Sequence, residues 1–156
     1  MKKLIPFLIL ALTITSCGGD NNETPVPAAG AGELVLNADG KNIIFSATHL
    51  NIATFSIGGL YTTTIEATKT EGTLKIRVLA AGKSTGEFRL DNEASLMYGT
   101  ATNSAFFSDD CNKYTGSVTF TEYDAQNRVI SGTYSGTVCS GNQEKNISGS
   151  FNKLKY

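Results

Sequence analysis

TLKIRV, residues 73–78, alternates polar or charged side chains with apolar ones along its whole length. A period of two residues places the apolar set on one face of a β-strand and the charged set on the other. The same alternation returns in EFRL, residues 87–90, and in SVTFT, residues 117–121. We therefore expect strands that are buried on one side only.

Short segments rich in Gly, Asn, Asp and Ser separate these alternating runs, as turns do. They cover residues 38–40, 58–59, 70–72, 81–82, 124–127 and 140–142. No stretch after the first sixteen residues has a convincing helical period. Short strands joined by turns predict an all-β domain, an antiparallel β-sandwich of about nine or ten strands. An up-and-down, lipocalin-like β-barrel is the alternative.

The alternation also predicts which side chains face the core, because a slip of one residue would invert every face. The side chains expected to be buried are Leu74, Ile76, Val78, Phe88, Leu90, Val118, Phe120, Ile130, Tyr134, Val138 and Phe151. Those expected to face water are Lys75, Arg77, Glu87, Arg89 and Thr119.

A near-repeat, ISGTY at 130–134 and ISGSF at 147–151, predicts two neighbouring strands. Cross-strand pairs contribute roughly 0.2–1 kcal/mol each and help to fix the register. The partners expected across this pair are Val138 with Ile147, Tyr134 with Phe151, and Gly136 with Gly149. Within residues 61–78 they are Ile65 with Ile76, and Glu66 with Lys75.

Residues 1–16 are organised as an export signal, with Lys2 and Lys3 ahead of an apolar run. The run is too short to cross a bilayer, which needs roughly 20 residues, so a transmembrane anchor is the poorer reading. ITSC, residues 14–17, resembles the lipobox of bacterial lipoproteins. That resemblance implies cleavage before Cys17 and acylation of this cysteine. An ordinary secretory signal is the alternative.

Residues 17–32 contain two of the three prolines and no apolar periodicity, so we expect a lipidated, flexible tether. The polar and acidic residues behind Cys17 resemble the export tag of Bacteroidota-type surface lipoproteins. We therefore expect the outer membrane, reached through the lipid anchor, and leave open whether the protein faces the periplasm or the cell surface.

Residues 33–156 are expected to form one β-sandwich domain. Without Lys2 and Lys3, the chain has 11 basic and 14 acidic residues, a formal charge of about −3. Since nucleic-acid binding needs a concentrated basic patch, we expect no nucleic-acid partner.

Cys111 and Cys139 are the two cysteines beyond the expected anchor. An even pair in an exported chain usually forms a disulfide. A hairpin turning at 124–127 allows a register that places the two opposite each other on the outer face, within disulfide range. The other partners in this register are Phe120 with Ile130, Val118 with Gly132, Gly116 with Tyr134, and Tyr114 with Gly136. Each glycine would then lie under a large side chain.

VTFTEYD at 118–124, together with the two near-repeats, resembles a family of small Bacteroidota-type lipoproteins of unknown function. The resemblance covers about residues 32–156 and implies a β-rich fold and a location in the cell envelope. It implies no activity and supplies no functional residues.

We expect no catalysis, cofactor or metal. His49 is the only histidine, so a Ser/His/Asp triad would have to use it. Asp109 and Asp110 could offer oxygen ligands to calcium, but the spacing of a calcium loop is absent. The carboxylates that could be paired for glycoside hydrolysis are Glu66, Glu87, Asp109, Asp110 and Glu122.

A non-catalytic binding or interaction module, with a protein or glycan partner, is the function that we expect. Tyrosines that could stack on sugar rings are Tyr61, Tyr98, Tyr114 and Tyr123, although ordinary sheet packing explains them as well. A carrier of a small apolar ligand needs a hollow barrel. An aromatic platform would favour glycan binding, and a filled sandwich with a polar surface would favour an interaction role.

Overall fold

The alternating segments form eleven strands in the computed structural model, which describes residues 28–69, 74–100 and 105–156. Every strand pair is antiparallel, and the described residues contain no α-helix. The strands are β1 (Glu33–Ala38), β2 (Lys41–Phe45), β3 (Leu50–Ile57), β4 (Leu60–Thr68), β5 (Leu74–Ala81), β6 (Gly86–Arg89), β7 (Ala94–Thr100), β8 (Ala105–Phe107), β9 (Gly116–Asp124), β10 (Val129–Ser140) and β11 (Gln143–Lys155). Two short 3₁₀ helices, η1 (Ala47–His49) and η2 (Ser108–Asp110), complete the described elements.

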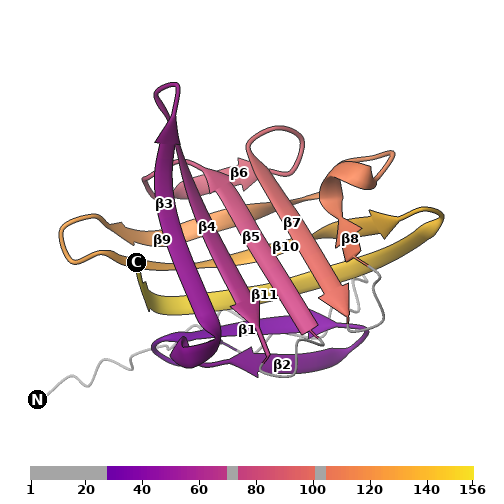
Figure 1. The fold of residues 1–156 in the computed structure, drawn as a ribbon, viewed down its shortest axis with the longest axis horizontal. Helices are drawn as coiled ribbons and strands as arrows, with labels where there is room; N and C mark the ends of the chain where they lie inside the picture. The colour runs from indigo at the N-terminus through magenta and orange to yellow at the C-terminus, as the bar shows by residue number, and fades with distance from the viewer. Residues whose placement is uncertain (1–27, 70–73, 101–104) are drawn as a thin grey trace, which may run out of the picture.

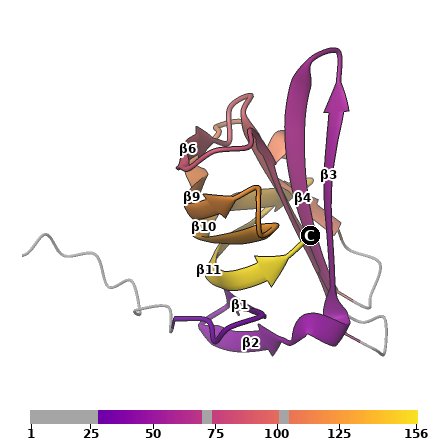
Figure 2. The same ribbon diagram turned by 90° about the vertical axis from the view of Figure 1, so that its left-hand side faces the viewer.

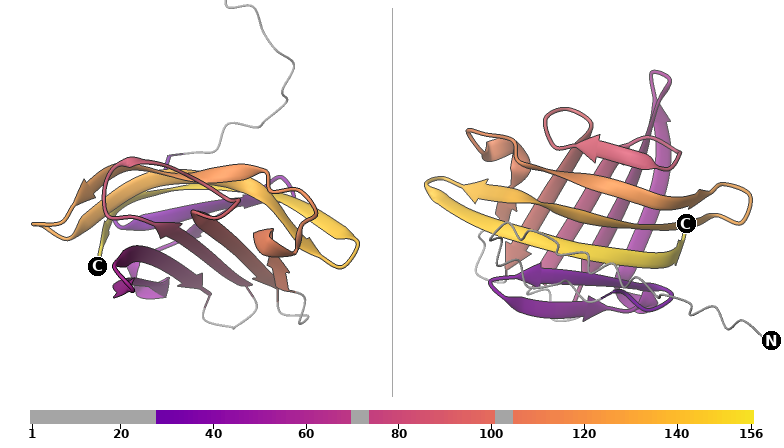
Figure 3. Two further views of the ribbon diagram at one scale, coloured as in Figure 1. Left: turned by 90° about the horizontal axis from the view of Figure 1, so that it is seen from above. Right: turned by 180° about the vertical axis from the view of Figure 1, so that it is seen from behind.

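The strands belong to one sheet that folds over into two layers (Figure 1). The front layer has the order β3-β4-β5-β7-β8, and the back layer has the order β6-β9-β10-β11-β1-β2. The layers are continuous at one corner, where Phe107 of β8 pairs with Cys139 of β10. Their strands cross steeply, as Figure 2 and Figure 3 show from the side and from behind. This all-β half-barrel confirms the predicted fold class, and it is not a closed barrel, since no pairing in the described residues joins β2 or β6 to β3.

Side chains fill the space between the layers. Phe120 lies at the centre of an aromatic cluster, with its ring centroid 5.6 Å from that of Phe88, 5.5 Å from that of Tyr123 and 5.7 Å from that of Phe151. The hydroxyl of Tyr134 donates a hydrogen bond of 3.0 Å to the main-chain oxygen of Val35. Burial raises the pKa of Tyr134, and also that of Tyr98, which lies in the same core.

The predicted faces are largely confirmed. Of the side chains expected in the core, all are buried except Leu74 and Phe88, which are half-buried. Lys75, Glu87 and Arg89 are exposed, as expected. Arg77 and Thr119 are only partly exposed.

The predicted pairing partners are wrong by two residues. Tyr134 pairs with Gly149 rather than Phe151, and Val138 pairs with Lys145 rather than Ile147. The reason is the tight turn at 141–142, closed by Ser140 and Gln143, because the expected partners require a turn centred one residue later. Gly136 accordingly pairs with Ile147 and not with Gly149.

The other two expected registers slip in the same way. Ile65 pairs with Val78 instead of Ile76, and Glu66 pairs with Arg77 instead of Lys75. Between β9 and β10 the observed partners are Phe120 with Gly132, Val118 with Tyr134, and Gly116 with Gly136. A slip of two keeps every side chain on its predicted face, so the burial pattern survives the error.

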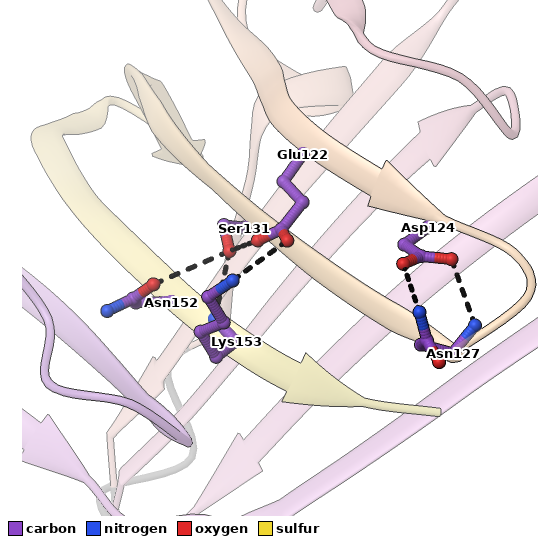
Figure 4. Close-up of polar contacts among 6 residues, drawn as sticks. All are labelled: Glu122, Asp124, Asn127, Ser131, Asn152 and Lys153. Carbon is purple, nitrogen blue, oxygen red and sulfur yellow. Dashed lines mark hydrogen bonds and ion pairs between the residues drawn. The ribbon is translucent and has the colours of Figure 1, made fainter.

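The hairpin turn and an irregularity beside Ser131 together set the slip between β9 and β10. Ile130 pairs with Tyr123, three residues from its expected partner Phe120, and beyond Ser131 the difference falls to two residues. The register shifts next to Ser131 on both sides, toward β9 and toward β11. The Ser131 hydroxyl accepts a hydrogen bond of 2.9 Å from the Lys153 main-chain N–H and donates one of 2.6 Å to Glu122 (Figure 4). This hydroxyl therefore satisfies a main-chain donor that the irregular ladder leaves without its usual partner.

Packing of the chain begins before β1. Ala29 is buried, its N–H donates to the Ser150 hydroxyl (3.0 Å), and its carbonyl accepts from the Asn152 amide (3.0 Å). Residues 28–32, assigned to the tether from sequence, thus include a segment fixed against β11. The predicted signal peptide and Cys17 lie outside the described residues, and no helix in the described part is long and apolar enough to span a membrane.

Candidate binding face

The outer face of the back layer carries rows of hydroxyl and amide side chains. Alternation places Thr133 and Ser135 outward on β10, on either side of buried Tyr134. Strand pairing then continues a row from Ser117 through Ser135 and Ser148 to Asn37. Four neighbouring strands therefore present a polar side chain at the same level of the sheet.

A second row is joined by hydrogen bonds. The Thr115 hydroxyl donates to the Thr137 hydroxyl at 2.8 Å, and Thr137 donates to the Asn146 side-chain oxygen at 2.9 Å. Thr115 lies just ahead of β9, whereas Thr137 and Asn146 are partners across β10 and β11. These contacts fix the orientation of the side chains before any ligand arrives.

The two rows line an open depression of about 940 Å³. We call it the polar trough and define it by Asn37, Ser117, Thr133, Ser135, Thr137, Asn146 and Ser148. Two of the charged residues on its lining, Lys145 and Asp39, form an ion pair of 2.6 Å. The trough is therefore rich in hydrogen-bonding groups, and this pair contributes little net charge.

A disulfide fastens the segment beside the trough. Cys111 and Cys139 are bonded, with their Cα atoms 5.1 Å apart. The predicted disulfide and its outer-face position are confirmed, because Cys139 alternates with inward Val138. The predicted hairpin pairing is wrong, since Cys139 pairs with Phe107 of β8, and Cys111 lies in the segment that follows η2. This segment leads through Thr115 into β9, so the disulfide fixes one end of the trough.

Three of the residues considered for catalysis, His49, Glu66 and Glu87, lie away from the polar trough. His49 ends η1, and its Nδ1 lies 3.0 Å from the Ser46 hydroxyl in the same local turn. Glu66 faces outward on the front layer opposite Arg77, and Glu87 lies on the short strand β6. The structure brings none of these three to the polar trough.

Asp109 and Asp110 are exposed in η2. Asp109 accepts hydrogen bonds from the hydroxyls of Ser108 (2.9 Å) and Ser95 (3.4 Å), which fix the start of the loop. In the described ranges, no group of three or more His, Cys, Asp or Glu side chains is arranged to hold a metal ion.

Glu122 belongs to the bulge rather than to a catalytic pair. It accepts hydrogen bonds from the Ser131 hydroxyl and from the Lys153 ammonium, the latter at 3.0 Å (Figure 4). These two bonds hold the pKa of the Glu122 carboxyl below its ordinary value. Asp124 accepts hydrogen bonds within its own turn from Asn127, which lower its pKa too.

The four candidate tyrosines do not form one platform. Tyr98 is buried against Phe106, and Tyr123 is half-buried between Phe120 and Tyr156. Tyr61 lies near the tip of the β3–β4 hairpin, under the ammonium of Lys83, which is 3.8 Å from the ring centroid. Tyr114 is exposed and immediately precedes Thr115 of the second row.

Sequence reasoning missed the polar trough, although a signal was present. The outward positions of 115–119, 133–137 and 146–150 carry only Ser, Thr and Asn, where an ordinary solvent face mixes in Lys and Glu. The trough could not be assembled from this signal without knowing that β1 lies beside β11. Comparison with protein-family models, curated proteins and solved structures finds no match for the chain.

Proposed function

We propose that this protein is an exported, lipid-anchored binding module of the outer membrane, and that its polar trough binds a neutral, hydroxyl-rich glycan chain. The observation that carries the proposal is the row formed by Ser117, Ser135, Ser148 and Asn37. Neighbouring strands are about 4.8 Å apart. An extended sugar chain lying across the strands would therefore meet a new polar side chain about once per sugar unit.

The chemistry of the trough supports an uncharged ligand. Hydroxyls and amides both donate and accept hydrogen bonds, so they can match the hydroxyl groups of a sugar in either sense. The ion pair of Lys145 with Asp39 accounts for two of the three charged residues on the lining, and the third, Glu144, is acidic and so disfavours an anionic ligand. A phosphate or polyanionic ligand would call for a basic cluster instead.

Non-catalytic binding fits the remaining features better than the alternatives. The interior between the layers is occupied by packed rings around Phe120, which leaves a carrier function without support. Asp39 and Glu144 are the two carboxylic residues on the lining of the trough, and Asp39 is held in the ion pair with Lys145, so hydrolysis of a bound glycan has no free pair of carboxyls there. Binding of a glycan without catalysis is the function that this face supports best.

A glycan array probed with the purified, lipidated protein tests the proposal. We expect binding to at least one class of neutral glycan, and we expect Ser135→Trp to weaken it by at least about tenfold, because the indole would occupy the floor of the trough. Ser135 is exposed, so the substitution leaves the core unchanged. Thr68→Trp, on the front layer, is the matched control and should bind as the unmodified chain does.

Two results would overturn this assignment. One is the absence of binding to every neutral glycan tested. The other is a Ser135→Trp variant that binds as tightly as the control.

A further inference from the structure

The sheet has three free edges within the described residues, and they differ in one respect. β6 has four residues, including Glu87 and Arg89, and β2 has five and begins with Lys41. β3 has eight residues, LNIATFSI, with no charge and no proline. Soluble proteins usually protect a free edge by shortness, charge or proline. β3 has none of these protections, and Figure 2 shows it at the outer edge of the front layer.

The turn that follows β3 determines which of its main-chain groups point outward. Gly58 and Gly59 both have positive φ, 60° and 87°, and form a two-residue turn closed by Ile57 and Leu60. Residues that flank such a turn form a hydrogen-bonded pair, and hydrogen-bonded pairs then recur at every second residue. Residues 51, 53, 55 and 57 therefore bond to β4. The N–H and C=O groups of Ile52, Thr54 and Ser56 point away from the sheet.

We propose that β3 pairs antiparallel with β3 of a second copy of this chain, about a two-fold axis at Thr54. In this register Thr54 faces the second copy's Thr54, and Ile52 faces the second copy's Ser56. All six outward N–H groups of the two strands then find a carbonyl partner. The two front layers join into one continuous sheet, which is the edge-addition mode of strand recognition.

The side chains of β3 suit a second copy. On the outer face, Phe55 would lie opposite the second copy's Ala53, so each ring packs on a small residue. Phe55 is 42% exposed in the single chain, and with Ala53 it lines a shallow depression of about 280 Å³. Because β3 carries no charge, two copies meet without like-charge repulsion.

The hairpin tip carries further exposed apolar side chains in β4, directly beside β3. Leu60 lies on the same outer face as Phe55 and is 72% exposed, whereas Tyr61 lies on the opposite face and is 46% exposed. Three of the five exposed large apolar side chains in the described part of the chain thus lie on this one hairpin. Their clustering at an unprotected edge marks an interaction site rather than scattered surface residues.

Cysteine crosslinking tests the register in the full chain, expressed with its leader and processed by the cell. Facing residues of a hydrogen-bonded pair are about 5.5 Å apart at Cα, within the range of a disulfide. Thr54→Cys should therefore give a covalent dimer on a non-reducing gel after mild oxidation. Ser56→Cys, equally exposed on the same strand, is the control and should remain monomeric, because its own copy lies four residues away along the strand.

A proline variant tests the same edge without a crosslink. The Thr54 N–H points away from β4, so Thr54→Pro removes two hydrogen bonds of the dimer, one from each copy, and none of the single chain. We expect it to raise the dimer dissociation constant by at least about tenfold in detergent, with an unchanged circular dichroism spectrum. Equal crosslinking of Thr54→Cys and Ser56→Cys, a Thr54→Cys crosslink to another protein instead of a second copy, or a monomeric unmodified chain would each overturn the proposal.

Discussion

Tyr134 and Gly149 are partners across β10 and β11, and the phenol ring of Tyr134 lies over the bare Cα of Gly149. The ring reaches across β11 in this way to donate its hydrogen bond to Val35 of β1. A side chain on Gly149 would collide with both the ring and the Val35 oxygen. This glycine is therefore required by close approach and not by its backbone angles.

We predict that Gly149→Ala lowers the free energy of unfolding by about 1–3 kcal/mol, as overpacking of a filled core does. Gly99→Ala is the matched control, since its nearest neighbours would be the Lys75 Cβ and the Met97 Sδ, each at 3.9 Å. This control should leave stability unchanged or raise it by up to about 1 kcal/mol. Urea unfolding measures both, and equal effects would contradict the packing argument.

Phe120→Ala should lower the free energy of unfolding by about 3–5 kcal/mol, because the residue contacts three other rings in the core. Tyr114→Ala, which truncates a ring that is 51% exposed, should change it by no more than about 0.5 kcal/mol. Thermal and urea unfolding of the two variants provide the comparison. A small loss for Phe120→Ala would show that the core is not packed as described.

Reduction of the disulfide should lower the free energy of unfolding by about 3–4 kcal/mol on the chain-entropy model, because the bond closes a loop with a sequence separation of 28. The Cys111→Ala/Cys139→Ala variant should lose the same amount and should no longer respond to reductant. Alkylation of the denatured, unreduced protein should find neither cysteine reactive. Labelling of both would contradict the pairing.

Glu122 should make stability depend on pH in the acid range. Its pKa in the folded protein is lowered, first by the Ser131 hydrogen bond and then by Lys153. Its stabilisation is therefore complete above the unfolded pKa of about 4.3 and is lost as the pH falls through the folded pKa.

Glu122→Gln should flatten the curve of stability against pH below about pH 4.3. Urea unfolding in a pH series measures this. Adding Ser131→Ala to Glu122→Gln should give no further flattening, because no carboxyl then remains at residue 122 for the Ser131 hydroxyl to hold. A curve as steep as that of the unmodified chain would show that Glu122 is not held in this way.

Cys17→Ala should abolish acylation and leave the protein unprocessed or soluble. Metabolic labelling with a radioactive fatty acid, followed by fractionation of the cells, measures both outcomes. Cys111→Ala is the matched control and should retain the label. Undiminished label in Cys17→Ala would contradict the lipobox assignment.

Alternation in the sequence was sufficient to predict the faces of the sheet but not its pairing. Ile76 and Val78 were correctly placed in the core, because each strand carries its own two-residue pattern. Their partners were not, because a slip of two residues leaves that pattern unchanged. The actual slip depends on the turn at 141–142 and on the irregularities beside Ser131, which only the folded ladder reveals.

The disulfide was predicted correctly from an incorrect pairing. Compartment chemistry and an even number of cysteines carried the prediction, whereas the proposed hairpin partners of Cys139 did not survive. The polar trough could not be predicted from the sequence, for a different reason. It needs Asn37 beside Ser148, two residues more than one hundred positions apart in the chain, and local sequence contains no information on that neighbourhood.

The position of β11 has a consequence for the order in which the protein can be completed. The last long segment of the chain, Gln143–Lys155, lies between β1 and β10 in the middle of the back layer. β1 therefore cannot pair with its neighbour β11 until nearly the whole domain has been made. Contacts between residues this distant in sequence form slowly. A chain that emerges from a channel with its N-terminus first cannot close the back layer until residues 143–155 have also emerged. Clipping of the C-terminal strand, after passage or by a premature stop codon, would leave two long edges exposed at once and favour aggregation.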